Sequence, residues 1–327
     1  MKRTRSGKRT KAQHYVPRLH LRQFLGQSPM NMVWVYSKAR GTALPSRVEE
    51  TGQQTNYYSV RDDNGDYHDA IDNMFDDIET KAAAPYRALL AGQIPHDQAR
   101  ADFAVFVATC FTRSPALIRA YAEGTARAMH LELRLNAKTR EGFDRLTDAM
   151  ESETGKVIAD RERAYKFIND PSRYSIGISE KRGLAAIGIA DDIAPILYDR
   201  PWTLVESLGA HFITSDNPVY RWVPPETRHP FYGDGGFKNA RAEITFPLSP
   251  TLLLLIGGNG KMEARVSVDS ATVWQMNEMR ATAAEDLIFA DRKDEHVRKL
   301  ARRYRDNQPR LQIGHELAEG VDVKITR

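Results

Sequence analysis

The apolar residues of this chain change their spacing twice, and that change limits the folds open to it. Before about residue 68 the apolar segments are short and rich in β-branched and aromatic residues, which predicts strands. From there onward apolar residues recur every three or four positions, the period of an α-helix. After about residue 200 short apolar strands return. We therefore predict an α+β fold, mostly helical, with a small mixed or antiparallel sheet built from N-terminal and C-terminal strands.

The same pattern predicts individual elements. The helical middle, 68–199, is expected to hold helices at about 68–91, 96–112, 116–135, 139–154 and 180–197, with a loop through Pro171 before the last of them. Strands are expected at 31–36, 56–60, 202–206, 211–214, 244–246, 252–256 and 287–290, and further helices at about 270–285 and 294–304. We expect 202–206 and 211–214 to pair with each other around Gly209. The strand-rich part covers about 200–290.

Positive charge is concentrated at the N-terminus. Residues 1–11 hold six Lys and Arg and no acid, and subtracting these six from the net charge of +4 leaves −2 for residues 12–327. We expect a flexible basic arm at 1–11 and one integrated domain at 12–327. Such an arm either attracts nucleic acid in a salt-dependent way or serves as a disordered, solubilising end.

Cysteine usage and hydropathy bear on the compartment. Cys110 is the single cysteine, so the chain has neither an intramolecular disulfide nor a CxxC metal site. Its apolar run, 103–111, is far too short to span a bilayer, and the first residues lack a signal-peptide pattern. We expect a cytoplasmic protein that does not contact membranes.

Glu79 and Arg113 stand out because each disagrees with its surroundings. Glu79 falls inside the apolar stripe of the first long helix, where an acid needs a partner, a metal or a raised pKa. Arg113 follows the most apolar helix, just before Ser114 and Pro115. It either offsets the dipole of that helix or presents a planar fork to a phosphate. Glu79 equally fits a simple ion pair with an arginine at the margin of the stripe.

Two further segments carry candidate chemistry. Asp216 and Asn217 directly follow an apolar strand, a common location for catalytic or metal-binding groups, although Asp-Asn-Pro is also a favourable turn. The opening motif places His14 in a loop, with Arg18 and Arg22 four residues apart and so on one face of a short helix. His14 is either a structural hydrogen-bonding group or a base.

These segments resemble a bacterial family known as domain of unknown function 4238. The matching pieces, in the family's order, are His14-Tyr15-Val16-Pro17 with Leu21-Arg22 and Phe24, Tyr57-Tyr58, Glu79, Arg113-Ser114-Pro115, Phe212 to Val219, Pro247-Leu248-Ser249-Pro250 and Asn277. Gln23 departs from the pattern, in which many relatives carry Asn. The resemblance implies one integrated domain and no particular reaction. It suggests that His14, Arg22, Glu79, Arg113, Asp216 and Asn277 belong to one site.

Together these residues predict a hydrolase acting on a phosphodiester or nucleotide, and among such enzymes they favour a metal-dependent nuclease. Glu79 and Asp216 would bind Mg²⁺ or Mn²⁺ and act with His14 as catalytic groups. Arg18, Arg22, Arg113, Asn217 and Asn277 would bind the substrate. The alternative is a non-catalytic module that binds nucleic acid or a protein through the arm, and a small-molecule enzyme with an Arg-lined pocket also stays open.

Overall fold

The computed structural model describes residues 12–26, 31–61, 67–229, 233–257 and 264–307. The predicted basic arm, 1–11, lies outside the described residues. The fold is α+β, as predicted. Contacts group the chain into two compact units, one formed by residues 1–118 with 184–327 and the other by 119–183. The prediction of a single domain over 12–327 stays a prediction.

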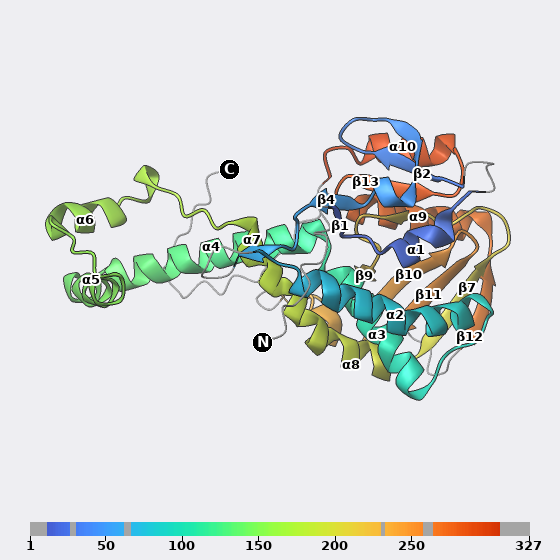
Figure 1. Ribbon diagram of the computed structural model, residues 1–327, viewed down its shortest axis with the longest axis horizontal. Coiled ribbons are helices and arrows are strands. Elements are labelled where there is room, and N and C mark those ends of the chain that lie inside the picture. Colours follow the sequence, from blue (N-terminus) through green and yellow to red (C-terminus); the bar gives the residue numbers. More distant parts are fainter. Residues whose placement is uncertain (1–11, 27–30, 62–66, 230–232, 258–263, 308–327) are drawn as a thin grey trace, which may run out of the picture. The chain divides into compact units, whose positions relative to one another are not determined.

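Two sheets form the framework of the first unit (Figure 1). The five-stranded sheet has the order β12-β7-β11-β10-β9 and contains β7 (Trp202–Ser207), β9 (Tyr220–Trp222), β10 (Glu243–Ser249), β11 (Leu252–Gly257) and β12 (Ala264–Val268). Only β12 runs parallel to its neighbour, β7, so this sheet is mixed. The antiparallel four-stranded sheet, β3-β2-β13-β8, joins β2 (Val33–Ser37) and β3 (Ala43–Ser46) to β8 (Thr214–Ser215) and β13 (Leu287–Ala290). N-terminal and C-terminal strands therefore share one sheet.

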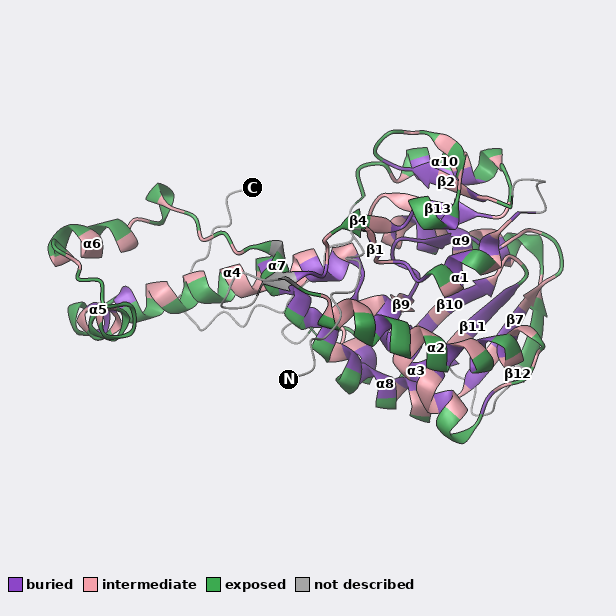
Figure 2. Cartoon of the chain, viewed as in Figure 1, coloured by how far each residue is buried: buried purple, intermediate pink, exposed green. Residues whose placement is uncertain are grey.

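Helices cover both faces of the five-stranded sheet (Figure 1). One face packs on α2 (Ala70–Leu90), α3 (Asp97–Thr112) and α8 (Ala190–Asp199) around a core that includes Trp202, Phe103 and Phe246. The other face meets α9 (Ser270–Ala283) at a smaller cluster that includes Val205, Leu253 and Val273. Figure 2 shows buried residues concentrated on these strands and on the helices facing them. Strand residues alternate between the two faces, which gives the sheet two apolar sides.

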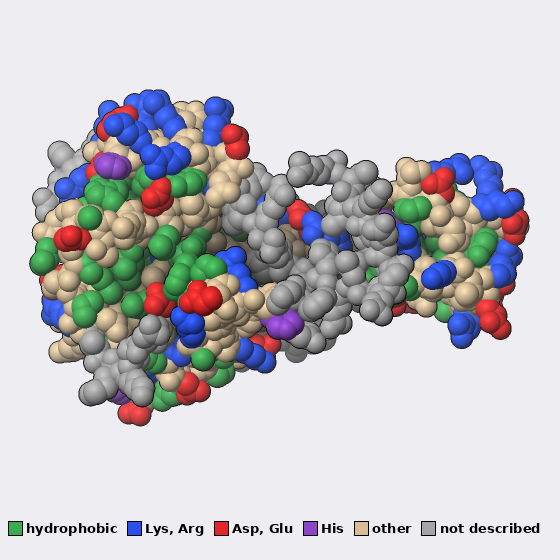
Figure 3. Space-filling model, turned by 180° about the vertical axis from the view of Figure 1, so that it is seen from behind, with side chains coloured by type: hydrophobic (Ala, Val, Ile, Leu, Met, Phe, Trp, Pro, Cys, Tyr) green, Lys and Arg blue, Asp and Glu red, His purple; other side chains and the backbone are tan. Residues whose placement is uncertain are grey.

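Short elements at the N-terminus complete this unit. They are β1 (Ala12–His14), α1 (Arg18–Leu21), β4 (Gln53–Thr55), β5 (Val60–Arg61) and β6 (Tyr67–His68), followed at the far end of the chain by α10 (Glu295–Arg303). β1 pairs with β4, and β5 pairs with β6. The predicted strand 56–60 is wrong over 56–59: β4 ends at Thr55, Asn56 has a φ of +53°, and β5 begins only at Val60. Lys and Arg side chains gather over the α10 end of the face shown in Figure 3.

Two other sequence predictions differ from the structure. Strand 211–214 does not pair with 202–206: β8 joins β13 in the four-stranded sheet, while β7 lies between β11 and β12. The predicted helix 180–197 is broken into α7 (Glu180–Gly183), a 3-10 segment at Leu184–Ile189 and α8. Gly183 and Gly188 lie in this stretch, and glycine weakens a continuous helix.

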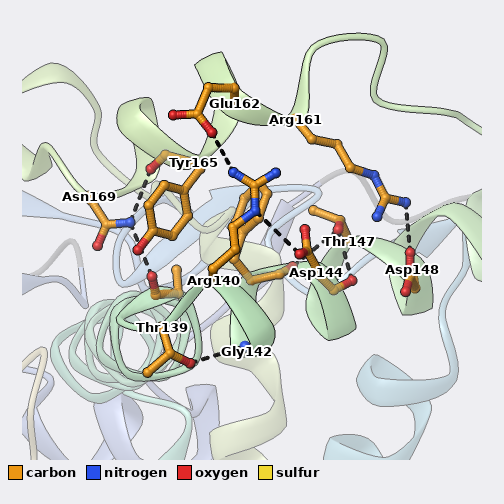
Figure 4. A network of polar contacts seen from close by, with 12 residues as sticks. Thr139, Arg140, Gly142, Asp144, Thr147, Asp148, Arg161, Glu162, Tyr165 and Asn169 are labelled. Atoms are coloured by element: carbon orange, nitrogen blue, oxygen red, sulfur yellow. Dashed lines mark hydrogen bonds and ion pairs between the residues drawn. The ribbon is translucent and has the colours of Figure 1, made fainter.

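The second unit is a small helical body with a polar network. It contains most of α4 (Pro115–Ala137), together with α5 (Arg140–Thr154) and α6 (Arg161–Ile168), the last of which the sequence pattern missed. Arg140 pairs with Asp144 at 3.3 Å and with Glu162 at 2.5 Å, which links α5 to α6 (Figure 4). α6 has no buried residue; the Arg140–Glu162 pair, the pairs of Arg161 with Asp148 and Glu151, and a Phe143–Tyr165 ring contact connect it to α5.

Within the described residues no single helix is long and apolar enough to cross a membrane. The helices Asp97–Thr112 and Pro115–Ala137, which form a bent pair, are together long and apolar enough by length and composition alone.

Candidate functional site

Arg113 and Glu79 form a largely buried ion pair in the first unit. Arg113 caps the C-terminus of α3, and both its Nη1 and its Nη2 donate to Oε1 of Glu79, at 3.2 and 3.1 Å. The Arg113 side chain is 2% exposed and that of Glu79 is 22% exposed. The guanidinium carbon lies 4.9 Å from the centre of the Phe75 ring, one helical turn before Glu79 on α2. The polar residues that disagreed with their apolar helices are therefore each other's partners.

The pair leaves one carboxylate oxygen available. Oε2 of Glu79 has no hydrogen-bond partner in the described part of the chain. Arg113 is held in turn by Tyr58, whose hydroxyl donates to the Arg113 carbonyl at 3.0 Å. Because buried Arg113 fixes Oε1, the second oxygen is turned to a defined position at a partly exposed surface.

His14 lies close to this pair. Its Nε2 is 3.2 Å from the carbonyl oxygen of Val48, and Arg18, Glu79 and Arg113 are near enough for their charges to affect the imidazole. Burial lowers the pKa of His14 below its ordinary value of 6.5, and Arg18 and Arg113 lower it further. At neutral pH the ring is therefore uncharged. With Nε2–H donating to Val48, Nδ1 carries the lone pair and has the electronic form of a base.

Arg18 and Arg22 lie on the surface beside Glu49. Arg18 opens α1, whereas Arg22 begins the 3-10 turn that follows it. Arg22 approaches Glu49 at 3.7 Å, with both side chains more than half exposed. Both arginines lower the pKa of Glu49, after the larger effect of a backbone hydrogen bond. An exposed ion pair is weak, so either guanidinium is free to bind a phosphate instead.

Asp216 is a buried anchor. Its Oδ1 accepts the backbone N–H of Glu285 at 2.8 Å, and its Oδ2 accepts those of Asp286 and Leu287 at 2.7 and 2.6 Å. Burial raises the pKa of Asp216 to about 6, against these three hydrogen bonds. The carboxylate thus fastens the start of β13 to the end of β8. Its hydrogen bonds account for its burial, and a catalytic or metal-binding role stays a prediction.

Asn217 and Asn277 belong to the same anchoring region. Nδ2 of Asn217 donates to the carbonyl of Ala283 at 3.2 Å. Asn277 accepts from the backbone N–H of Ile213 at 3.0 Å and donates to the carbonyl of His211 at 2.8 Å. The predicted site residues therefore fall into a group around Arg113, a group around Asp216, and the exposed Arg18 and Arg22 beside Glu49. The single six-residue site stays a prediction.

Tyr15 lies between the two groups. Its ring packs edge-on against Tyr57 at 6.1 Å, and Tyr57 packs on Tyr58, which holds Arg113. Burial and the charges of Asp216 and Asp286 raise the pKa of Tyr15 above its ordinary range.

His20, Lys38 and Arg280 are among the buried polar residues that the sequence did not predict. His20 is fully buried between Tyr86 and Thr214, Lys38 is fully buried at the end of α9, and Arg280 is 2% exposed within α9. Arg280 donates to the carbonyl of Pro218 at 2.6 Å and to Thr245, and burial lowers its pKa to about 9. His20 belongs to the opening motif, but nothing in its spacing separates it from a surface histidine.

Metal ligands are sparse. No group of three or more His, Cys, Asp or Glu side chains comes together among the described residues. Cys110 is buried, and burial raises the pKa of its thiol to about 12, so it is an inert core residue.

Comparison with known proteins identifies a family and no individual relative. A family model described as "Protein of unknown function (DUF4238)" matches residues 12–294. The searches of curated proteins and of solved structures each found no match.

Proposed function

Because the chain belongs to the DUF4238 family, whose description names no activity, we propose from the site alone that the protein is a hydrolase of phosphodiester or nucleotide substrates. The observation that supports this most is the group formed by His14, Glu79 and Arg113. It combines an uncharged, half-buried imidazole with a carboxylate that a buried arginine orients.

In the proposed reaction His14 acts as the general base. Its Nδ1 takes a proton from the attacking water, and the Nε2–H bond to Val48 holds the ring in the required tautomer. Arg18 and Arg22 bind the phosphate oxygens from the surface. Arg113 positions Glu79 and is not itself free for substrate.

Glu79 is where we place a divalent cation, if the reaction uses one. Mg²⁺ is commonly bound by one or two protein carboxylates, with water and substrate phosphates completing its coordination. Oε2 of Glu79 supplies one such ligand. Three backbone N–H groups donate to the carboxylate of Asp216, so we assign Asp216 a structural role and not a cation-binding one.

The basic arm at 1–11 would bring nucleic acid toward the site.

The test is cleavage of labelled single- and double-stranded DNA and RNA by the purified protein, with Mg²⁺, with Mn²⁺ and with a chelator. His14→Ala should lower kcat by about 10²–10⁴-fold, the usual contribution of a positioned base. Glu79→Gln should also lower kcat, because the cation loses its charged protein ligand. Because the pKa of His14 lies below 6.5, kcat/KM should rise with pH through a value under 6.5 and then level off.

His296→Ala and Glu226→Gln are matched controls, because both residues lie in the first unit, away from this group. Both variants should cleave at the rate of the natural protein. Binding of oligonucleotides that is lost with residues 1–11, without cleavage under any condition, would replace the proposal with a non-catalytic binding module. Equal rates in His14→Ala and the natural protein would reject His14 as the base.

A further inference from the structure

A cleft of about 190 Å³ lies between α9 and the outer face of the five-stranded sheet. The sheet contributes Tyr220, Trp222, Glu243, Thr245 and Leu255, and α9 contributes Thr272, Gln275, Met276 and Met279. The strand residues are two apart, so they share a face, and the helix residues follow one stripe at three- and four-residue spacing. Regular structure therefore builds the cleft. It is smaller than the roughly 300–1,000 Å³ of drug-sized pockets, which favours a small ligand.

The register places an acid beside an indole. Glu243 on β10 is directly opposite Trp222 on the edge strand β9, and Thr245 is opposite Tyr220. Side chains opposite each other in an antiparallel pair have Cβ atoms about 4.5–5.5 Å apart. The carboxylate of Glu243 and the ring of Trp222 are thus neighbours at one end of the cleft.

Glu243 lacks a cation. It is half-buried, and in the described part of the chain its carboxylate makes no hydrogen bond or ion pair; burial raises its pKa. Two arginines next to this corner are already engaged, Arg221 with Asp234 at 2.9 Å and Arg241 with Glu226 at 2.8 Å, while the charge of Arg228 acts on Tyr220 rather than on Glu243. A partly desolvated carboxylate without a partner is costly, and a bound cation removes that cost.

The opposite end of the cleft is already occupied by positive charge. The guanidinium carbon of Arg280 lies 6.0 Å from the centre of the Tyr220 ring, and Arg280 also donates to Thr245. Trp222 has no ring or cation contact among the described residues. The uncompensated negative charge and the available aromatic ring therefore lie together at the Trp222 end.

We propose that this cleft binds a small organic ammonium ion. The cationic head lies on the indole of Trp222 beside the carboxylate of Glu243, and the apolar part of the ligand lies against Met276 and Met279. Aromatic rings attract ammonium groups through their quadrupole, and thioether side chains adapt to varied apolar shapes. The proposal does not depend on the hydrolase activity.

Choline is the probe. Its neutral isostere is 3,3-dimethyl-1-butanol (dimethylbutanol below), in which a carbon atom replaces the choline nitrogen. We expect choline to shift the indole NMR signal of Trp222 in a saturable way and to bind about tenfold or more tightly than the isostere, as a cation–π contact and an ionic contact together supply. Glu243→Gln should abolish that preference. Met279→Arg, at a position 39% exposed, should repel choline by adding positive charge at the cleft.

Glu206→Gln removes a carboxylate that pairs with Arg265 at the β12 edge of the sheet, the edge opposite to β9, so it should leave choline binding unchanged. Unfolding curves of all variants separate loss of binding from loss of fold, and Met279→Arg keeps the test decisive if Glu243→Gln does not fold. The proposal fails if choline and dimethylbutanol bind equally well, or if neither binds up to the solubility limit. It also fails if Glu243→Gln retains the preference for the cation.

Discussion

His20 shows how two hydroxyl groups fix the proton of a buried imidazole. Tyr86 has one hydroxyl proton and donates it to the carbonyl of Leu248 at 2.9 Å. It therefore accepts from Nδ1–H of His20, 2.9 Å away, and the hydroxyl of Thr214 donates to Nε2 at 2.7 Å. The ring also packs on Phe246, 4.6 Å between centres. One ring nitrogen donates and the other accepts, so these hydrogen bonds require the neutral imidazole. Burial lowers the pKa of His20 to about 3.

His20 and Asp216 should have opposite effects on stability in mild acid. Unfolded His takes a proton near pH 6.5 and folded His20 only near 3, so the free energy of unfolding should fall as pH drops through this range. The pKa of Asp216 rises from 3.8 to about 6 on folding. Its contribution is therefore present below 3.8 and is lost as pH rises through 6. Between these values each group changes stability by up to about 1.4 kcal/mol per pH unit, with opposite sign.

Urea unfolding between pH 4 and pH 6 measures both contributions. Asp216→Asn should make stability rise more steeply with pH, because the opposing titration of Asp216 is removed. His20→Gln should make stability fall with rising pH instead. A pH dependence of His20→Gln equal to that of the natural protein would show that the folded imidazole titrates normally.

At this scale the sequence singled out Glu79 and Arg113 as charged residues in apolar surroundings, but it did not predict that they pair with each other. It could not predict His20, Lys38 or Arg280. Each is a single polar residue whose burial depends on carbonyls and hydroxyls contributed by distant segments.

At the scale of elements, the C-terminus of α9 is held by Lys38, which directly follows strand β2. Nζ of Lys38, just after β2, donates to the carbonyls of Ala281 and Ala284 at 3.2 and 2.6 Å and to that of Asn307 at 2.6 Å. The last carbonyls of a helix have no partner within it, and the helix dipole favours a cation there. Lys38 thus caps the C-terminus of α9 although it lies more than 200 residues earlier in the sequence.

Lys38→Met should lower the free energy of unfolding by about 2–4 kcal/mol, because buried carbonyls lose their charged donor while the side-chain volume is kept. Chemical denaturation followed by circular dichroism measures this loss. Arg40→Met, two residues further on and exposed, is the control and should change stability by less than about 0.5 kcal/mol. A comparably small change in Lys38→Met would mean that water replaces Nζ at these carbonyls.

Local pattern predicted most elements but not their partners. The apolar runs that became β7, β11 and β13 were found, yet β8 joins β13 rather than the preceding β7. The reason lies in Asp216 and Asn277, which bind backbone groups of residues far away in the chain and draw 211–217 toward α9 and β13. Spacing within a segment carries no information about such contacts.

At the scale of the whole molecule, the second unit is an insertion between two parts of the first. The chain leaves the first unit after Ile118 and returns at Leu184, and both residues pack in one apolar cluster with Phe75. The two ends of the insertion are therefore held near each other within the first unit.

Replacing residues 119–183 by a short Gly/Ser linker should leave the first unit folded, because its sheets and cores come from the retained segments. Near-ultraviolet circular dichroism should retain its signature, since the four tryptophans, Trp34, Trp202, Trp222 and Trp274, all remain. A single cooperative unfolding transition is expected. Loss of that transition would show that the inserted helices are required for the fold.

The pairing of β2 with β13 has a consequence for synthesis on the ribosome. Ser37 lies opposite Leu287, 250 residues later in the chain. At about 5–20 residues per second, translation of that interval takes roughly 12–50 s. Throughout this time β2 has its final partner on only one side, through β3, and exposes an apolar strand edge. We therefore expect this edge of β2 to need protection from pairing with other chains until β13 has emerged.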